Sequence, residues 1–160
     1  MSLAGIVLAT LLVSAFGGLV PFVNVELWLV GVSATCPTAA LWPVVLAASL
    51  GQVAAKALLY LGGDAAVPCL RRRLPRAWAG LSAFEARRSL GTTMVFGSAL
   101  LGLPPLYVVS VVAGVARFPF ARFLALTLAG RILRFAVVFV LPRVIYDFAP
   151  GWTWATSPGR

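Results

Sequence analysis

The stretch TLAGRILRFAVVFV, residues 127–140, places two arginines inside a long apolar run. Arg131 and Arg134 interrupt a segment that is otherwise apolar from Phe123 to Leu141, and a run of this length can cross a bilayer core of about 30 Å. A charge in hydrocarbon costs at least about 2.5 kcal/mol. Because residues three apart share one face of a helix, both guanidinium groups need partners on the same side of this segment.

The composition indicates a polytopic membrane protein with a single membrane domain over residues 1–160. The chain is 61% hydrophobic and 11% charged, whereas soluble domains carry about 25% charged residues. The net charge is +9, but the sequence shows no separate polar domain that could present a basic face to nucleic acid. Positive charge beside a bilayer instead favours orientation in the membrane and attraction of anionic lipid head groups.

The residue types needed for catalysis are scarce. The chain has no histidine, no paired carboxylates, and two cysteines, Cys36 and Cys69, without metal-ligand spacing. General acid–base and metal chemistry therefore lack their usual groups. We expect no enzyme activity, no metal and no cofactor.

The first half of the chain predicts a crossing, a hairpin and a second crossing. Residues 3–20 are nearly long enough to span and lack the basic segment of a cleaved signal. Residues 21–37, bounded by prolines, are too apolar for an aqueous loop and about half as long as a crossing, which favours a re-entrant hairpin. Residues 38–61 predict a full crossing. Within that crossing, small residues spaced four apart predict close helix contact: Ala47, Gly51 and Ala55.

The arginine-rich segment 62–90 is predicted to be cytoplasmic, by the positive-inside rule. Ser82 and Glu85 have capping-box spacing and predict a short interfacial helix there. By the same orientation, the N-terminus is also cytoplasmic.

The second half predicts a hairpin followed by a crossing. Residues 91–116 are apolar but broken at a Pro-Pro pair, so one kinked crossing and a second hairpin both fit. The hairpin is favoured because it returns Arg117 and Arg122 to the cytoplasmic side. Residues 121–142 then cross, and 149–160 form a tail. The predicted fold is all-α: three full transmembrane helices and two opposed re-entrant hairpins, arranged as an inverted repeat of 21–61 and 91–142.

Glu26 is the one acid of four that falls in a predicted membrane segment. We therefore predict that Glu26 faces Arg131 and Arg134. Two arginines against one carboxylate leave positive charge for an anion such as phosphate, which suits the planar guanidinium group. A purely structural ion pair between hairpin and helix is the alternative.

Five further positions are candidates for accessory roles. Lys56 lies about one turn from the end of its predicted crossing, which favours snorkelling to the cytoplasmic surface, with anion binding as the alternative. Tyr107 follows the Pro-Pro break and is placed to line a cavity. The candidates are Lys56, Gln52, Tyr107, Arg117 and Arg122.

Several stretches resemble the DedA family, also called the VTT or SNARE-associated domain family, and most closely its compact bacterial branch. They are PFVNVELWLVGVS, LGQVAAKALLYLGGD and GLPPLYVVSVVAGVARFPFARFLALTLAGR, within residues 20–135. The resemblance implies two facing re-entrant hairpins in a bacterial cytoplasmic membrane and movement of polyprenyl phosphates or phospholipids. Glu26 matches the acid of the family's first hairpin and Gly130-Arg131 the glycine-arginine of its last helix, whereas Gln52 stands where many members carry an acid.

The expected function is that of a lipid transporter, flippase or scramblase that moves an anionic lipid along a polar seam. The alternative is a non-transporting scaffold or assembly factor whose buried charges secure the fold. A homodimer is the alternative to a monomer, because a single chain of 160 residues is small for enclosing a lipid path by itself.

Overall fold

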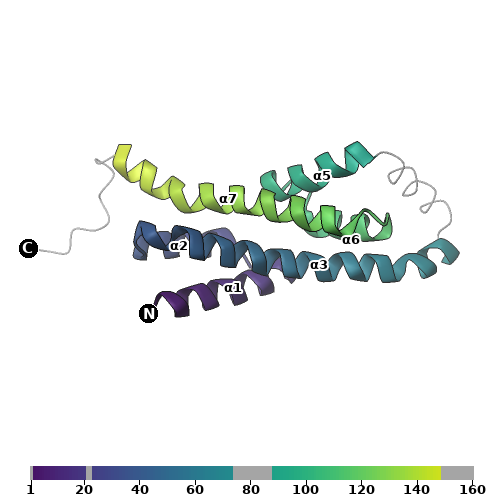
Figure 1. Cartoon of the computed structure of the whole chain (residues 1–160), viewed down its shortest axis with the longest axis horizontal. Coiled ribbons are helices and arrows are strands. Elements are labelled where there is room, and N and C mark those ends of the chain that lie inside the picture. The colour runs from purple at the N-terminus through teal and green to yellow at the C-terminus, as the bar shows by residue number, and fades with distance from the viewer. Residues whose placement is uncertain (1, 21–22, 74–87, 149–160) are drawn as a thin grey trace, which may run out of the picture.

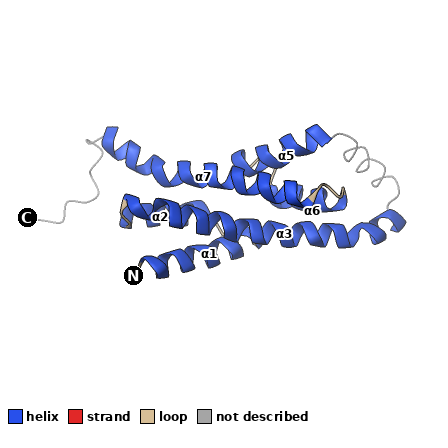
Figure 2. Ribbon diagram, viewed as in Figure 1, coloured by secondary structure: helices blue, strands red, loops and turns tan. Residues whose placement is uncertain are grey.

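The protein is all-helical over the residues that its computed structural model describes, 2–20, 23–73 and 88–148 (Figure 1). Each half has two short helices followed by a long one, and the described residues contain no strand (Figure 2). The elements are α1 (Leu3–Leu19), α2 (Val25–Thr35), the 3-10 helix η1 (Thr38–Ala40), α3 (Leu41–Arg73), α5 (Arg88–Leu101), α6 (Leu106–Val115) and α7 (Phe120–Phe148). The all-α prediction is confirmed.

Among the described residues, two helices are long and apolar enough to cross a membrane, at 41–69 in α3 and 120–141 in α7. The crossing predicted at 3–20 is a helix of 17 residues, which falls short of the roughly 20 that a crossing needs. The described part of the chain therefore has two helices of spanning length, rather than the three predicted.

The chain reverses direction at two breaks that its residues dictate. After α1, the side chain of Asn24 caps α2, accepting from the backbone N–H groups of Glu26 at 2.9 Å and Leu27 at 3.3 Å. After α5, Gly102 takes a positive φ of 82°, which ends a helix without a Cβ penalty. Pro104 and Pro105 follow in this turn and cannot donate to a continuing helix.

The two short-helix pairs enter the bundle from opposite ends (Figure 1). Helix α1 runs from the left end to the middle and α2 returns, whereas α5 runs from the right end to the middle and α6 returns. The reversal predicted within 21–37 is therefore wrong in place, since Val25–Thr35 is one continuous helix. The second break, at the Pro-Pro pair of 91–116, is where it was predicted.

The boundary predicted between the second crossing and the arginine-rich segment also differs from the structure. Helix α3 continues to Arg73, so residues 62–73 are helical rather than part of a loop. The start of α1 and the end of α3 lie at opposite ends of the bundle, and they cannot both face the cytoplasm if the long axis crosses the membrane. The predicted interfacial helix at Ser82 and Glu85, and the tail 149–160, fall outside the described residues.

The two halves share a packing pattern. The sequence Ser-Ala-x-x-Gly-Leu occurs at 14–19 and again at 98–103, each time where the first short helix ends. A Cβ on Gly51 would lie 2.5 Å from the Leu11 carbonyl oxygen, and one on Gly130 would lie 2.7 Å from the Cβ of Ala99. Each long helix thus uses a glycine to approach the first short helix of its own half. This confirms the contact role predicted for Gly51.

Two apolar clusters occupy different levels of the bundle. One cluster joins α2 to residues 44–48 of α3 and to Phe135 and Phe139 of α7. The other joins α5 and α6 to Tyr60 of α3 and Phe123 of α7. Because α3 and α7 run in opposite directions, positions 49–59 of α3 and 124–134 of α7 lie at the level between the clusters, near the middle of both long helices.

Candidate functional site

A polar cavity of about 360 Å³ lies at this middle level. Its wall combines the end of α1, the start of α2, the turn between α5 and α6, and the middle of both long helices. Its volume is within the range of small-molecule sites, about 300–1,000 Å³. Most of the side chains predicted for the site line it: Glu26, Gln52, Lys56, Tyr107, Arg131 and Arg134.

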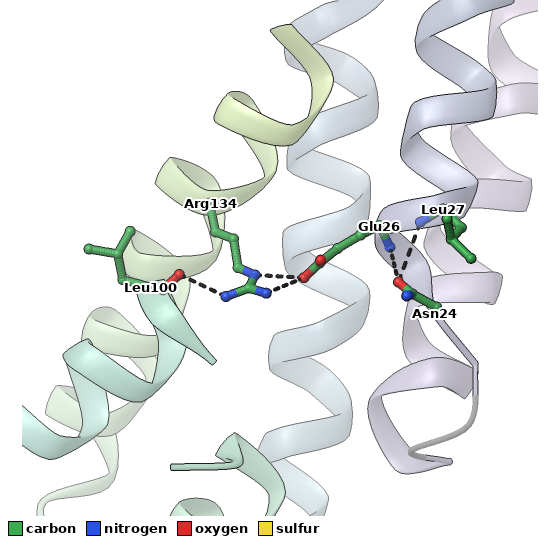
Figure 3. Close-up of polar contacts among 5 residues, drawn as sticks. All are labelled: Asn24, Glu26, Leu27, Leu100 and Arg134. Atoms are coloured by element: carbon green, nitrogen blue, oxygen red, sulfur yellow. Dashed lines mark hydrogen bonds and ion pairs between the residues drawn. The ribbon is translucent and has the colours of Figure 1, made fainter. Parts of the chain in front are cut away.

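Glu26 and Arg134 form the ion pair that the sequence predicts (Figure 3). The Oε1 atom of Glu26 accepts from Nε of Arg134 at 2.6 Å and lies 2.5 Å from its Nη2. Nη1 of Arg134 donates to the Leu100 carbonyl oxygen at 3.0 Å. One guanidinium group therefore connects α2, α5 and α7, at side-chain exposures of 23% for Arg134 and 35% for Glu26.

Arg131 lies in the same cavity wall without a direct bond to Glu26. Its Nε atom is buried and, within the described part of the chain, has no hydrogen-bond partner. Its guanidinium carbon lies 5.6 Å from the centroid of the Phe135 ring, within cation–π range. The expectation that one carboxylate serves both arginines is thus met for Arg134 and not for Arg131.

Lys56 does not snorkel, contrary to the prediction. It is only 5% exposed, and its Nζ donates to the Gly18 carbonyl oxygen in the last turn of α1. The prediction failed because α3 does not end near residue 61 but continues to Arg73. Lys56 is consequently in the middle of a long helix, with its ammonium group at the cavity.

The remaining accessory candidates separate into two groups. Gln52, 5% exposed, and Tyr107, 45% exposed, line the cavity. Arg117 and Arg122 do not line it. Arg117 lies just after α6, where its largely exposed side chain is 3.6 Å from Asp64, and Arg122 is exposed on α7.

The sequence does not predict which backbone groups belong to the site. The carbonyl groups of Gly18 and Leu100, each in the last turn of a short helix, accept from Lys56 and Arg134. A Cβ on Gly102 would lie 2.9 Å from Nη1 of Arg134, so glycine keeps this approach open. The Gly-x-Pro-Pro run marks this turn in the sequence, but nothing local tells which side chain reaches it.

Within residues 2–20, 23–73 and 88–148, no three His, Cys, Asp or Glu side chains come together as possible metal ligands. The cationic lining instead favours an anion. A second cavity, of about 520 Å³ between α1 and α2, is lined by Ile6, Leu27, Trp28, Gly31, Val32 and Thr35 and has no charged side chain in its wall.

Comparison of the chain with protein-family profiles, with characterised protein sequences and with solved structures gives no match in any of the three.

Proposed function

We propose that this protein moves an anionic lipid across a membrane, with the head group passing through the polar cavity and the tails staying in the bilayer. The observation that carries the proposal is the charge of the cavity wall. Lys56, Arg131 and Arg134 line it, and Glu26 is the acid among its lining residues. A cavity with more cations than acids, at the middle of two helices of spanning length, is suited to an anion at membrane depth.

The arrangement of the helices supports a path through the bilayer. We propose that the pairs α1–α2 and α5–α6 are re-entrant hairpins whose tips meet at the cavity, as in an inverted repeat. Both tips, residues 17–19 and 102–107, contribute to its lining. Non-helical backbone at membrane depth is tolerated where it lines such a cavity. The same architecture is what the resemblance to the DedA family implies, and that membership is part of the proposal.

The start of α6 adds a second favourable element for an anion. Pro105 is the N-cap of α6 and no side chain caps this helix end, whereas Asn24 caps α2. The free N–H groups of a helix N-terminus attract negative charge. Pro105, Leu106 and Tyr107 all line the cavity, so this end of α6 contributes to its positive potential.

The test is lipid movement in proteoliposomes containing a fluorescent anionic phospholipid, followed by the fraction of label that an external quencher reaches. We expect wild type to move the lipid, and Arg131→Ala and Glu26→Gln each to reduce the rate to that of protein-free vesicles. Arg122→Ala, outside the cavity, is the matched control and should keep the wild-type rate. If both cavity variants moved the lipid at the wild-type rate, the proposed mechanism would be wrong.

A scaffold without transport is the second candidate, and the contacts of Arg134 favour it specifically. This side chain joins three helices, which a purely structural role would also require. Thermal unfolding in detergent separates the two candidates. If the melting temperatures of Glu26→Gln and Arg131→Ala are far below that of wild type, the result favours the scaffold. If both variants keep the wild-type melting temperature and lose lipid movement, the result favours the transporter.

A further inference from the structure

The first short helix of each half ends near the middle of the bundle (Figure 1). A helix end leaves carbonyl groups without partners in the same helix, and it carries about half a negative charge. Gly18 of α1 and Gly102, the residue after α5, both line the cavity, so these two ends lie deep in the molecule. Each of them is therefore stabilised by a positive group close by.

A side chain of the neighbouring long helix supplies this positive group in both halves. Lys56 of α3 donates to the Gly18 carbonyl oxygen, and Nη1 of Arg134 in α7 donates to the Leu100 carbonyl oxygen at 3.0 Å. Lysine and arginine differ in shape and in the geometry of their donors, and what they share here is a positive charge. The feature that the two halves repeat is thus a cation at the end of the first short helix.

Helix packing holds the ammonium group of Lys56 at this place. A Cβ on Gly18 would lie 2.4 Å from that of Ala55, so the end of α1 touches α3 one residue before Lys56. The lysine side chain is only 5% exposed. Because a buried charge without a hydrogen-bond acceptor is costly, the ammonium group is kept at the Gly18 carbonyl.

In transporters built as inverted repeats, the C-terminal ends of broken helices coordinate a free cation such as Na⁺. We propose that Lys56 is a tethered cation that takes the place of such an ion, so that the end of α1 needs no free metal cation. The occupancy of a free ion depends on its concentration, whereas a side chain is always present. Lipid movement by this protein is therefore independent of sodium and potassium gradients, a consequence that rests on the proposed function.

The first test is chemical rescue, read as the melting temperature of the full chain in detergent. Lys56→Ala removes the atoms that propylammonium contains. We expect propylammonium chloride at roughly ten times its Kd to raise the melting temperature of Lys56→Ala by about 3–6 °C. Tetramethylammonium, which has no N–H donor, should not raise it. Lys56→Met fills the same space without a charge, and this matched control should respond to neither cation.

The second test uses wild type and needs no variant to fold. Its melting temperature should be the same in sodium, potassium and tetramethylammonium chloride at equal ionic strength. A higher melting temperature in sodium or potassium overturns the inference, because a free metal cation then binds the folded protein. The role of Lys56 is overturned if Lys56→Ala responds equally to propylammonium and tetramethylammonium, or if Lys56→Met responds to propylammonium as strongly as Lys56→Ala does.

Lipid movement is scored separately, in wild-type proteoliposomes with and without a sodium or potassium gradient. If wild type moves lipid only when such a gradient is imposed, the inference fails while the proposed function stands. If propylammonium rescues Lys56→Ala but wild type moves no lipid under any condition, the tethered cation stands and the proposed function fails.

Discussion

Each half of the molecule places a cation from its long helix at the last turn of its first short helix, and the surroundings of the two cations differ. In the first half, Lys56 of α3 donates to Gly18 in the last turn of α1. In the second, Arg134 of α7 donates to Leu100 in the last turn of α5. Both cations satisfy carbonyl groups that a helix end leaves free, and both lie where the helix dipole favours positive charge. Only Arg134 also binds a carboxylate, that of Glu26.

We call the contacts of Arg134 with Glu26 and Leu100 the Arg134 corner, and the contact of Lys56 with Gly18 the Lys56 corner. The first contains an ion pair, and the second contains a cation bonded to an uncharged carbonyl group. The Arg134 corner ties the second half to the first, because Glu26 comes from α2. The Lys56 corner stays within the first half and, in the described part of the chain, includes no carboxylate within ion-pair distance. The glycines that bring the helices together show the same asymmetry, since Gly51 is followed by Gln52 and Gly130 by Arg131. A repeated scaffold therefore carries an unrepeated charge pattern.

The largest expected effect compares the two corners directly. Arg134→Met removes the bond to Leu100 and leaves Glu26 without its partner, so we expect a loss of about 2–4 kcal/mol in unfolding free energy, allowing for partial exposure. Lys56→Met removes one hydrogen bond and relieves a buried charge, and we expect a loss of at most about 1–2 kcal/mol. Equilibrium unfolding in mixed detergent micelles measures both.

The control for this comparison is a double variant. Glu26→Gln combined with Arg134→Met removes both charges, and it should recover part of the loss seen in Arg134→Met alone. If Lys56→Met costs as much as Arg134→Met, the two corners are energetically equivalent and the distinction drawn between them is wrong.

The next effect tests whether the halves pack alike. Gly51→Ala and Gly130→Ala each place a Cβ within 3 Å of a facing helix, and overpacking of this kind costs about 1–3 kcal/mol. Gly62 in α3 and Gly97 in α5 have no atom within 4 Å of an added Cβ. Their alanine variants are the matched controls and should be neutral or stabilising by up to about 1 kcal/mol. Melting temperatures of the four variants measure this, and a tolerant Gly130→Ala would show that only the first half depends on close approach.

The sequence predicts the centre of the site better than the path of the chain. The Glu26–Arg134 pair follows from scarcity, because a buried arginine needs an acid and few acids exist. The sequence predicts that Lys56 lies near a helix end, because the pair Gly62-Gly63 is typical of one. This prediction is wrong. The helix continues there because Gly63 packs on α6, where an added Cβ would lie 2.3 Å from the Val111 carbonyl oxygen. That contact comes from a segment about fifty residues away, so no local pattern reveals it.

The first reversal shows the same limit. Residues 3–20 have the composition of a crossing, and composition does not tell whether a helix of that length runs the full length of the bundle or ends at its middle, as α1 does. The turn depends on α1 meeting α3, where a Cβ on Gly18 would lie 2.4 Å from that of Ala55. The Ser-Ala-x-x-Gly-Leu repeat was present in the sequence and indicates that both reversals are built alike, but its meaning depends on the contacts of Gly51 and Gly130.

The smallest expected effect concerns a charged pair away from the cavity, which contrasts with the Arg134 corner. Arg117 and Asp64 are 3.6 Å apart at side-chain exposures of 64% and 47%, and exposed pairs of this kind contribute between about 0 and 1 kcal/mol. The same turn is held by Tyr60, a buried residue whose hydroxyl donates to the Phe118 carbonyl oxygen. We therefore expect Asp64→Asn to change the unfolding free energy by less than about 0.5 kcal/mol, and Tyr60→Phe to lower it by about 1 kcal/mol. Unfolding in mixed micelles at low and high salt measures both variants. A larger, salt-sensitive loss in Asp64→Asn would mean that the exposed ion pair, and not the buried hydroxyl, orders the turn between α6 and α7.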